Sequence, residues 1–365
     1  TMQSLFDLPD YSSHLEQRGG KQTMMLGFSD GTKDGGYLKA NWSILKTKEV
    51  LSKVCSKNGI DAIFFDGRGG PPARGGGKTH RFYAAQTKDI ANNEIQLTIQ
   101  GQTITSTYGT KEQFMHNSEQ LLTAGLSNNL FGKENIISRE SRKLLEELSD
   151  LSFAKYDELK QHEKFISYLE NRSTLKYYTK ANIGSRPGKR GQKAKLELTD
   201  LRAISFVGSW SQLKQNVPGY FGIGTAIKKL KDKGRLKELK KLFREIPFFE
   251  ALMNNSMMSL SKCYFELTSY MKEDEEYGDF WNILHNEYLL SKEMLLLVSG
   301  SKILMENEAV SRESIRIREN IVLPLLVIQQ YALHQISENS ANKALYEKIV
   351  TRSLYGNINA SRNSA

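Results

Sequence analysis

A glycine-rich segment, FFDGRGGPPARGGGKTH, occupies residues 64–80 and continues directly from the apolar run GIDAIFF. A short apolar run of this kind is typical of a buried strand, and in α/β folds the loops at the carboxyl ends of strands hold the functional sites. Glycine permits positive φ and a close approach to a ligand. Arg68 and Arg74 add planar forks that match phosphate or carboxylate. The segment therefore predicts a strand-end loop whose N–H groups and arginines bind a small, multiply charged anion.

Other interpretations of this segment are weaker. A flexible linker is disfavoured because linkers do not characteristically follow a buried strand. Gly77, Lys78 and Thr79 match the end of the phosphate-binding motif GxxxxGK[ST], but Pro72 stands where its first glycine is required. Pro72 also stands where the third glycine of a GxGxxG motif would fall. The segment thus predicts neither a nucleoside triphosphate nor a dinucleotide.

The order of elements indicates an α/β unit followed by a helical region. Strands are predicted at 21–28 and 60–65, with a helix at 37–56 between them, and weaker strands at 97–104 and 201–207. Helical patterns follow at 112–124, 138–148, 153–171, 225–244, 249–272, 277–299, 311–338 and 341–355. Four strands do not close a barrel of eight. Either the sheet is open or the other half of a barrel lies outside this chain.

The segment FSDGTKDGG at 28–36 is predicted to be a second strand-end loop. Asp30 in this loop is a candidate ligand for Mg²⁺ or Mn²⁺, which favour oxygen donors. Lys33 is a candidate cation for a phosphate or an enolate. An ordinary Asp-Gly turn is the alternative, and no second carboxylate stands at an equivalent strand end.

The net charge of +10 is concentrated in two basic stretches, 176–195 and 228–241. These stretches could bind nucleic acid, bind anionic metabolites, or face an acidic partner surface that is missing from this chain. Aromatic residues interleaved with the basic ones, which nucleic-acid binding would favour, are nearly absent, so we expect no nucleic-acid partner. Arg186 and Arg202 are candidate anion clamps, with a solvated basic loop as the alternative. No run approaches the length of a membrane span, and two distant cysteines suggest reduced thiols and a cytoplasmic location.

Taken together, these segments resemble the C-terminal portion of the phosphoenolpyruvate carboxylase family. The family pattern YSDSxKDGG followed by FHGRGGxxGRGGGP is matched by FSDGTKDGG and FFDGRGGPPARGGGK. GSRPGKR, LRAISFVGSWSQ, PGYFGIGTA, SIRIRENIVLPLLVIQQ and the terminal RNSA follow in the family's order. The resemblance spans essentially the whole chain.

The resemblance implies an enzyme, a carboxy-lyase that joins bicarbonate to phosphoenolpyruvate and yields oxaloacetate and phosphate with Mg²⁺ or Mn²⁺. It implies a mainly α fold with a partial α/β barrel, roughly the second half of a (β/α)8 barrel. Residues 1–224 would form that half with inserted helices, and 225–365 a helical region with an allosteric site. The family is usually tetrameric, and its members are more than twice this length. The chain alone is therefore expected to be inactive. A non-catalytic, dicarboxylate-binding or scaffold helical module is the alternative.

By the same resemblance, individual residues acquire expected roles. Asp30 would ligate the metal, with Lys33 as a nearby cation. Catalysis would depend on Lys33, Arg68 and Arg74, and substrate binding on Gly69, Gly70, Arg186 and Arg202. The pocket for an inhibitory dicarboxylate, aspartate or malate, would consist of Arg74, Lys262, Arg318 and Asn363.

The chain also departs from the family pattern. Asp66 stands where members usually carry histidine, Lys78 replaces a proline, and Gln102 replaces a common glutamate. An aspartate at neutral pH does not supply the proton or positive charge of a histidine. Either the reaction step runs differently here or Asp66 is structural.

Overall fold

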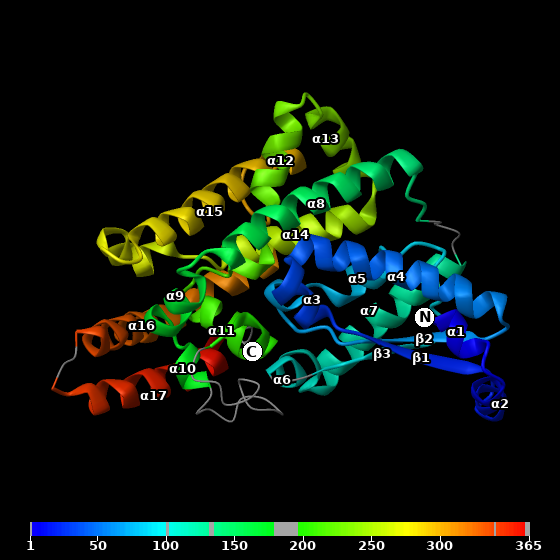
Figure 1. Ribbon diagram of the computed structural model, residues 1–365, viewed down its shortest axis with the longest axis horizontal. Coiled ribbons are helices and arrows are strands. Elements are labelled where there is room, and N and C mark those ends of the chain that lie inside the picture. The colour runs from blue at the N-terminus through cyan, green and yellow to red at the C-terminus, as the bar shows by residue number, and fades with distance from the viewer. Residues whose placement is uncertain (1, 100–101, 131–134, 179–195, 339–340, 362–365) are drawn as a thin grey trace.

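A computed structural model describes residues 2–99, 102–130, 135–178, 196–338 and 341–361 (Figure 1). The described part of the chain is mainly helical and contains one parallel sheet with the strand order β1-β2-β3. The strands are β1 (Lys21–Leu26), β2 (Asp61–Asp66) and β3 (Ile95–Leu97). Their register places Leu26 beside Asp66, and Asp66 beside Leu97. All three carboxyl ends therefore meet at one edge of the sheet.

The connections between the strands cross over through helices. From β1 the chain passes through α3 (Phe28–Gly35) and α4 (Tyr37–Lys57) to β2. From β2 it passes through the 3-10 turn η1 (Pro72–Arg74) and α5 (Thr79–Ala84) to β3. Two short helices, α1 (Met2–Phe6) and α2 (Pro9–Gln17), precede the sheet. Parallel strands need such crossovers, and the predicted strands at 21–28 and 60–65 and the helix at 37–56 are confirmed.

The remaining elements are helical. They are α6 (Gln102–Tyr108), α7 (Lys111–Leu130), α8 (Arg139–Gln161), α9 (Phe165–Arg172), α10 (Leu175–Tyr178), η2 (Leu198–Asp200), α11 (Ala203–Gln212), η3 (Val217–Gly219), α12 (Ile223–Asp232), α13 (Leu236–Glu245), α14 (Pro247–Ser261), η4 (Phe265–Glu273), α15 (Gly278–Ser299), α16 (Ala309–Ser337) and α17 (Lys343–Ser361). The single helix predicted at 225–244 is two helices, separated near Gly234, whose φ is 80°.

The strand predicted at 201–207 is wrong, because this segment begins α11. This helix is buried on more than one side: its buried positions are Ala203, Ser205, Phe206, Val207, Gly208, Ser209, Trp210 and Gln212. A short apolar run buried on several sides does not reveal by its periodicity whether it is a strand or a helix.

Two further expectations need correction. The loop predicted at 28–36 is largely the helix α3, which ends at Gly36 with a φ of 74°. The weak strand predicted at 97–104 is wrong: it shares only Leu97 with β3, and its residues 102–104 belong to α6. A short helix thus follows β1 where a loop was expected, and another begins at Gln102 where a strand was expected.

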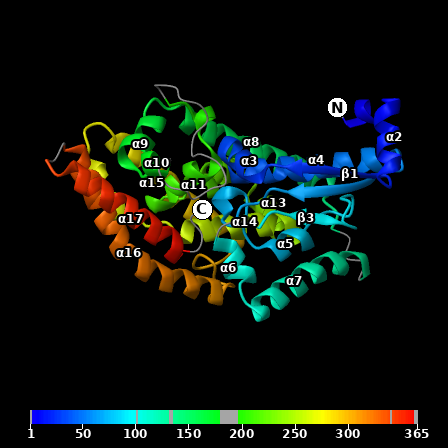
Figure 2. The ribbon, with the colours of Figure 1, turned by 90° about the horizontal axis from the view of Figure 1, so that it is seen from below.

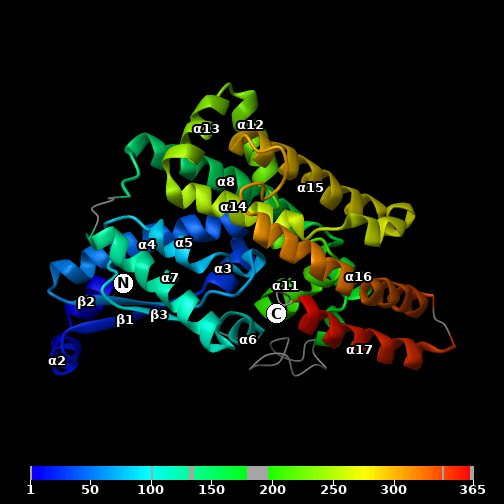
Figure 3. The same cartoon turned by 180° about the vertical axis from the view of Figure 1, so that it is seen from behind.

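The sheet lies at one side of the molecule with α4, α5 and α7 near it, and α9, α15, α16 and α17 lie towards the opposite side (Figures 1 and 2). The α12–α13 hairpin projects at one end of the molecule, and α16 and α17 run side by side at another (Figure 3). The main core contains side chains from the sheet, α4, α8, α12, α14 and α15. It includes Tyr220 and Ile227, on either side of the predicted boundary at residue 224. The division into 1–224 and 225–365 stays a prediction.

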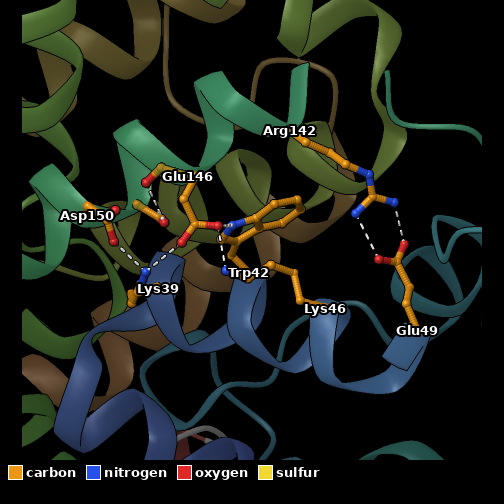
Figure 4. Close-up of polar contacts among 8 residues, drawn as sticks. Lys39, Trp42, Lys46, Glu49, Arg142, Glu146 and Asp150 are labelled. Atoms are coloured by element: carbon orange, nitrogen blue, oxygen red, sulfur yellow. Dashed lines mark hydrogen bonds and ion pairs between the residues drawn. The ribbon is translucent and has the colours of Figure 1, made fainter. Parts of the chain in front are cut away.

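A polar network fastens α4 to α8 (Figure 4). Glu146 accepts hydrogen bonds from Lys39 at 3.0 Å and from the Trp42 indole at 2.7 Å, and it also pairs with Lys46. One turn further along α4, Glu49 forms a two-bond ion pair with Arg142 at 2.7 and 2.8 Å. Such bidentate pairs are geometrically specific. The network holds α8 against the helix that supports the strand ends.

Candidate functional site

The first two strand-end segments lie against each other. Gly67 donates its N–H to the carbonyl of Leu26 at 2.9 Å, which continues the β1–β2 pairing past the strands. The Ser29 hydroxyl donates to the carbonyl of Arg74 at 3.0 Å. Segments 27–35 and 67–77 thus form one continuous surface at the carboxyl edge of the sheet.

The glycine-rich loop folds tightly on itself. Gly69 donates to Arg74 at 3.2 Å, and Gly77 donates to Gly70 at 3.0 Å. A Cβ added to Gly76 would lie 2.1 Å from the carbonyl oxygen of Gly69. The expectation that the loop's N–H groups would form an anion cradle is therefore wrong for these amides, which bind the loop's own carbonyls. The glycines permit close packing, and anion binding falls to side chains.

Arg68 is held in an aromatic and polar setting that leaves part of its fork available. Its side chain is buried, and its guanidinium carbon lies 4.2 Å from the centre of the Phe82 ring and 5.7 Å from that of Phe28. Its Nε donates to Gly75 at 3.4 Å. The buried Nη2 has no hydrogen-bond partner. A buried cationic donor without a partner is costly, so this nitrogen is a candidate for a bound anion.

Arg74, the last residue of η1, is also a buried arginine with an unpaired guanidinium nitrogen. It is 3% exposed, and its buried Nε has no hydrogen-bond partner. Burial lowers the pKa of Arg74 to about 10, against the opposing influence of Tyr178 and Asp30 nearby. The group is therefore still protonated at neutral pH and provides positive charge in a site shielded from water.

Lys33 and Asp30 lie one turn apart on α3. The ammonium of Lys33 is buried, 3.0 Å from the Asp34 carboxylate and 3.3 Å from the carbonyl of Leu198. Asp30 is exposed. Among the residues that the structure describes, no group of three or more His, Cys, Asp or Glu side chains could hold a metal ion. Asp30 can offer one oxygen ligand, but these residues do not complete a metal site.

Arg202 precedes α11, which packs against both α3 and η1. Its Nε is also buried without a hydrogen-bond partner. The structure thus brings the start of α11 to the same part of the molecule as the two loop arginines. Arg186, the other predicted clamp, lies outside the described residues.

Asp66 is fully buried at the end of β2. Its Oδ2 lies 2.6 Å from the ammonium of Lys48 and accepts a hydrogen bond from the Tyr83 hydroxyl at 2.5 Å. Burial lowers the pKa of Lys48, and Asp66 opposes that shift. These contacts favour a structural role for Asp66. The sequence analysis missed Lys48, although it follows Leu45 by three residues on the apolar face of a predicted helix.

Two of the residues predicted for the inhibitor pocket come together. Lys262 and Arg318 line one pocket beneath the loop segment 71–73. Lys214 and Glu319, both missed by the sequence analysis, line it as well. Arg74 is not among the described residues that line this pocket, although its neighbour Ala73 is, and Asn363 lies outside the described residues.

Burial and neighbouring charges shift the pKa of Lys262. Burial, followed by Lys214, lowers the pKa of Lys262 to about 8, while Glu319 acts in the opposite direction. The Lys262 ammonium has no hydrogen-bond or ion-pair partner among the described residues. A pocket with this charge can hold a small dianion.

Over the described ranges, no helix is both long enough and apolar enough to cross a bilayer.

Comparisons with known proteins identify the family to which this chain is similar. A model of the family described as phosphoenolpyruvate carboxylase matches residues 1–361. A phosphoenolpyruvate carboxylase of Corynebacterium efficiens is 34% identical over 100% of this chain and 40% of its own length. One from Prochlorococcus marinus strain MIT 9515 is 31% identical over 95% of this chain and 36% of its own length. One from Nitrosomonas eutropha is 31% identical over 100% of this chain and 40% of its own length. The chain thus spans about 40% of the length of the curated relatives it matches. On this evidence, the chain belongs to the phosphoenolpyruvate carboxylase family.

Proposed function

We propose that this chain supplies one wall of a phosphoenolpyruvate site, as the C-terminal part of an enzyme that carboxylates phosphoenolpyruvate with bicarbonate to oxaloacetate and phosphate. Such a reaction replenishes the tricarboxylic acid cycle. The fold proposed for this wall is about half of a (β/α)8 barrel, and the three parallel strands with helical crossovers are compatible with it.

One observation carries the proposal. Three arginines next to the strand ends, Arg68, Arg74 and Arg202, each hold a buried guanidinium nitrogen without a hydrogen-bond partner. Buried polar groups are almost always hydrogen-bonded, and charged donors left unpaired cost the most. A phosphate and a carboxylate on one small substrate would supply the missing acceptors, with Arg186 as a further clamp.

In this proposal the arginines bind the substrate and neutralise charge that develops on oxygen. Bicarbonate attacks the phosphorus of phosphoenolpyruvate, the bond from phosphorus to the enol oxygen breaks, and carboxyphosphate and an enolate result. Carboxyphosphate then releases CO₂, which the enolate carbon captures. Lys33 is proposed as a cation near the enolate. Its contacts with Asp34 and Leu198 orient it from beneath α3.

Mg²⁺ or Mn²⁺ would supply further positive charge when bound, and Asp30 is proposed as one ligand. Because the described residues do not complete a metal site, no step is assigned here to the ion. Gly69 and Gly70 are proposed to keep the loop close enough to the substrate for its arginines to reach it.

The chain alone is proposed to be inactive. The test measures oxaloacetate formation from phosphoenolpyruvate, bicarbonate and Mg²⁺ with this chain and, in parallel, with the full-length Corynebacterium efficiens relative. Turnover is expected for the relative alone, and substantial turnover by this chain would contradict the expectation of inactivity. The substrate site itself is tested in the relative by replacing the arginine that corresponds to Arg68 with glutamine. Loss of one such donor is expected to lower kcat by about 10²–10³. An unchanged kcat would refute the assignment.

The pocket formed by Lys262 and Arg318 is proposed to bind an inhibitory dicarboxylate, aspartate or malate, with Asn363 as a further contact and Arg74 as the link to the active site. A shared residue would couple the two sites. A tetramer for the full-length enzyme and a cytoplasmic location complete the proposal. Both cysteines are free thiols, as in a reducing compartment.

The pocket also supports a second candidate, a non-catalytic module that binds dicarboxylates. The cations that line this pocket all belong to this chain, whereas the proposed substrate site also needs residues of the full-length enzyme that lie outside this chain. Calorimetry with aspartate and malate on this chain tests both versions of the pocket, and Lys262→Ala is expected to abolish binding. Binding that survives this substitution would place the ligand elsewhere.

A further inference from the structure

The pocket beneath the glycine-rich loop contains its own carboxylate. Three cations, Lys214, Lys262 and Arg318, line it together with Glu319. Glu319 Oε2 lies 2.5 Å from the ammonium of Lys214. Its other oxygen, Oε1, has no hydrogen-bond donor among the described residues. The internal carboxylate therefore already holds one of the cations that an incoming anion would need.

The backbone that presents Lys214 is unusual. Lys214 has a φ of 57° and Asn216 a φ of 41°. Non-glycine residues adopt such values at a cost and do so preferentially near functional sites. The carbonyl of Lys214 is held by the N–H of Tyr264 at 2.8 Å. The chain thus maintains a strained turn that aims a largely buried lysine at Glu319.

The pocket is also small. With its side chains as they stand, the pocket has a volume of about 30 Å³. That is enough for about two water molecules and too little for a four-carbon dicarboxylate. A ligand of that size enters only if a side chain moves, and the wall includes the Lys214–Glu319 ion pair.

We infer that Glu319 is an internal competitor for this pocket, which a dicarboxylate must displace from Lys214 in order to bind. This inference rests on the proposed function, because it takes the pocket to be a dicarboxylate site. Displacement exchanges one carboxylate on Lys214 for another and leaves Glu319 to solvent. Glu319 thereby lowers the apparent affinity of the pocket and raises the ligand concentration at which it fills.

The test replaces Glu319 with glutamine and measures dicarboxylate binding to the 365-residue chain by calorimetry, with aspartate, malate and succinate as probes. Glutamine keeps an oxygen that accepts a hydrogen bond from Lys214, so the fold is expected to hold, and the thermal midpoint verifies this. Removing a nearby like charge is expected to strengthen binding of all three probes by about tenfold. Glu313→Gln is the matched control. Glu313 lies on the same helix, is paired with Arg316 and does not line the pocket.

The possible outcomes separate the two ideas. Tighter binding in E319Q, with E313Q like the parent, supports the competitor. If the parent chain binds a probe and E319Q binds it equally or more weakly, the competitor is refuted while the dicarboxylate pocket stands. Equal gains in both variants would reveal a general charge effect and also refute it. If neither the parent nor E319Q binds any of the probes, the dicarboxylate pocket itself fails, and the inference fails with it.

Discussion

The buried ion pair at the end of β2 yields the sharpest stability prediction. Lys48 is 1% exposed and Asp66 is 0% exposed, and their charged atoms are 2.6 Å apart. At an effective dielectric constant of about 20, two unit charges at that separation attract with about 6 kcal/mol. Desolvation of both ions offsets much of this attraction. The intact pair therefore adds little to the free energy of unfolding, whereas one of the two ions left buried without the other would lower it strongly.

Lys48→Met removes one charge and leaves the Asp66 carboxylate buried with only the Tyr83 hydroxyl as a donor. Breaking a buried pair in this way is expected to cost about 3–5 kcal/mol, a large part of the total stability of a typical domain. Asp66→Asn, which strands the lysine, is expected to cost a similar amount. The double variant K48M/D66N removes both charges of the pair, so neither is left buried without the other, and it is expected to be more stable than either single variant.

Urea unfolding followed by tryptophan fluorescence provides the assay, because Trp42 is buried on the same helix as Lys48. The midpoint and slope give the free energy of unfolding, and the four proteins form a double-mutant cycle. Lys53→Met is the matched control: Lys53 is an exposed lysine on the same helix, and this change is expected to stay within about 0.5 kcal/mol. A coupling energy below about 0.5 kcal/mol would refute the reasoning, since it would mean that the two charges do not depend on each other.

Three further predictions follow from single residues. Gly76→Ala is expected to cost about 2 kcal/mol or more in urea unfolding, because its Cβ would lie 2.1 Å from the Gly69 carbonyl; unchanged stability would show that the loop adapts freely. Burial alone would raise the pKa of Glu146. The hydrogen bonds that Glu146 accepts from Lys46, Trp42 and Lys39 outweigh burial and lower that pKa to about 2. The stability this provides is complete above the ordinary pKa of 4.5 and is lost as the pH falls through about 2. For such a half-exposed group it amounts to at most about 1 kcal/mol, and E146Q should remove this part of the pH dependence of the urea midpoint. Burial and Lys214 lower the pKa of Lys262 to about 8, so dicarboxylate affinity measured by calorimetry should fall as the pH rises through 8, and a flat profile would exclude its ammonium from the site.

Much of the first hundred residues could be predicted from local pattern. The strands β1 and β2 are short apolar runs bounded by turn residues, and α4 between them carries helical spacing over 21 residues. These signals depend on periodicity and chain order alone. Arg68 and Arg74 could be singled out in the same way, because their loop follows a strand. The grouping of Lys262 with Arg318 came from the family resemblance rather than from the pattern.

The errors occurred where burial, rather than periodicity, decides the structure. The segment at 201–207 is apolar on more than one side, and only its packing against α3 and η1 makes it a helix instead of a strand. The glycines of the loop indicated backbone freedom, but the sequence did not show that the loop's amides would bind its own carbonyls.

The sequence by itself determined the α/β order of the first hundred residues, the basic and glycine-rich character of the candidate site, and the family. Only the tertiary structure decided which charges meet. Lys48 pairs with Asp66 across 18 positions of the chain, and Lys214 pairs with Glu319 from a distant helix. The physical reason is that the strength of a charge pair depends on separation in space and on exclusion from water. A linear pattern encodes neither of these until the chain has folded.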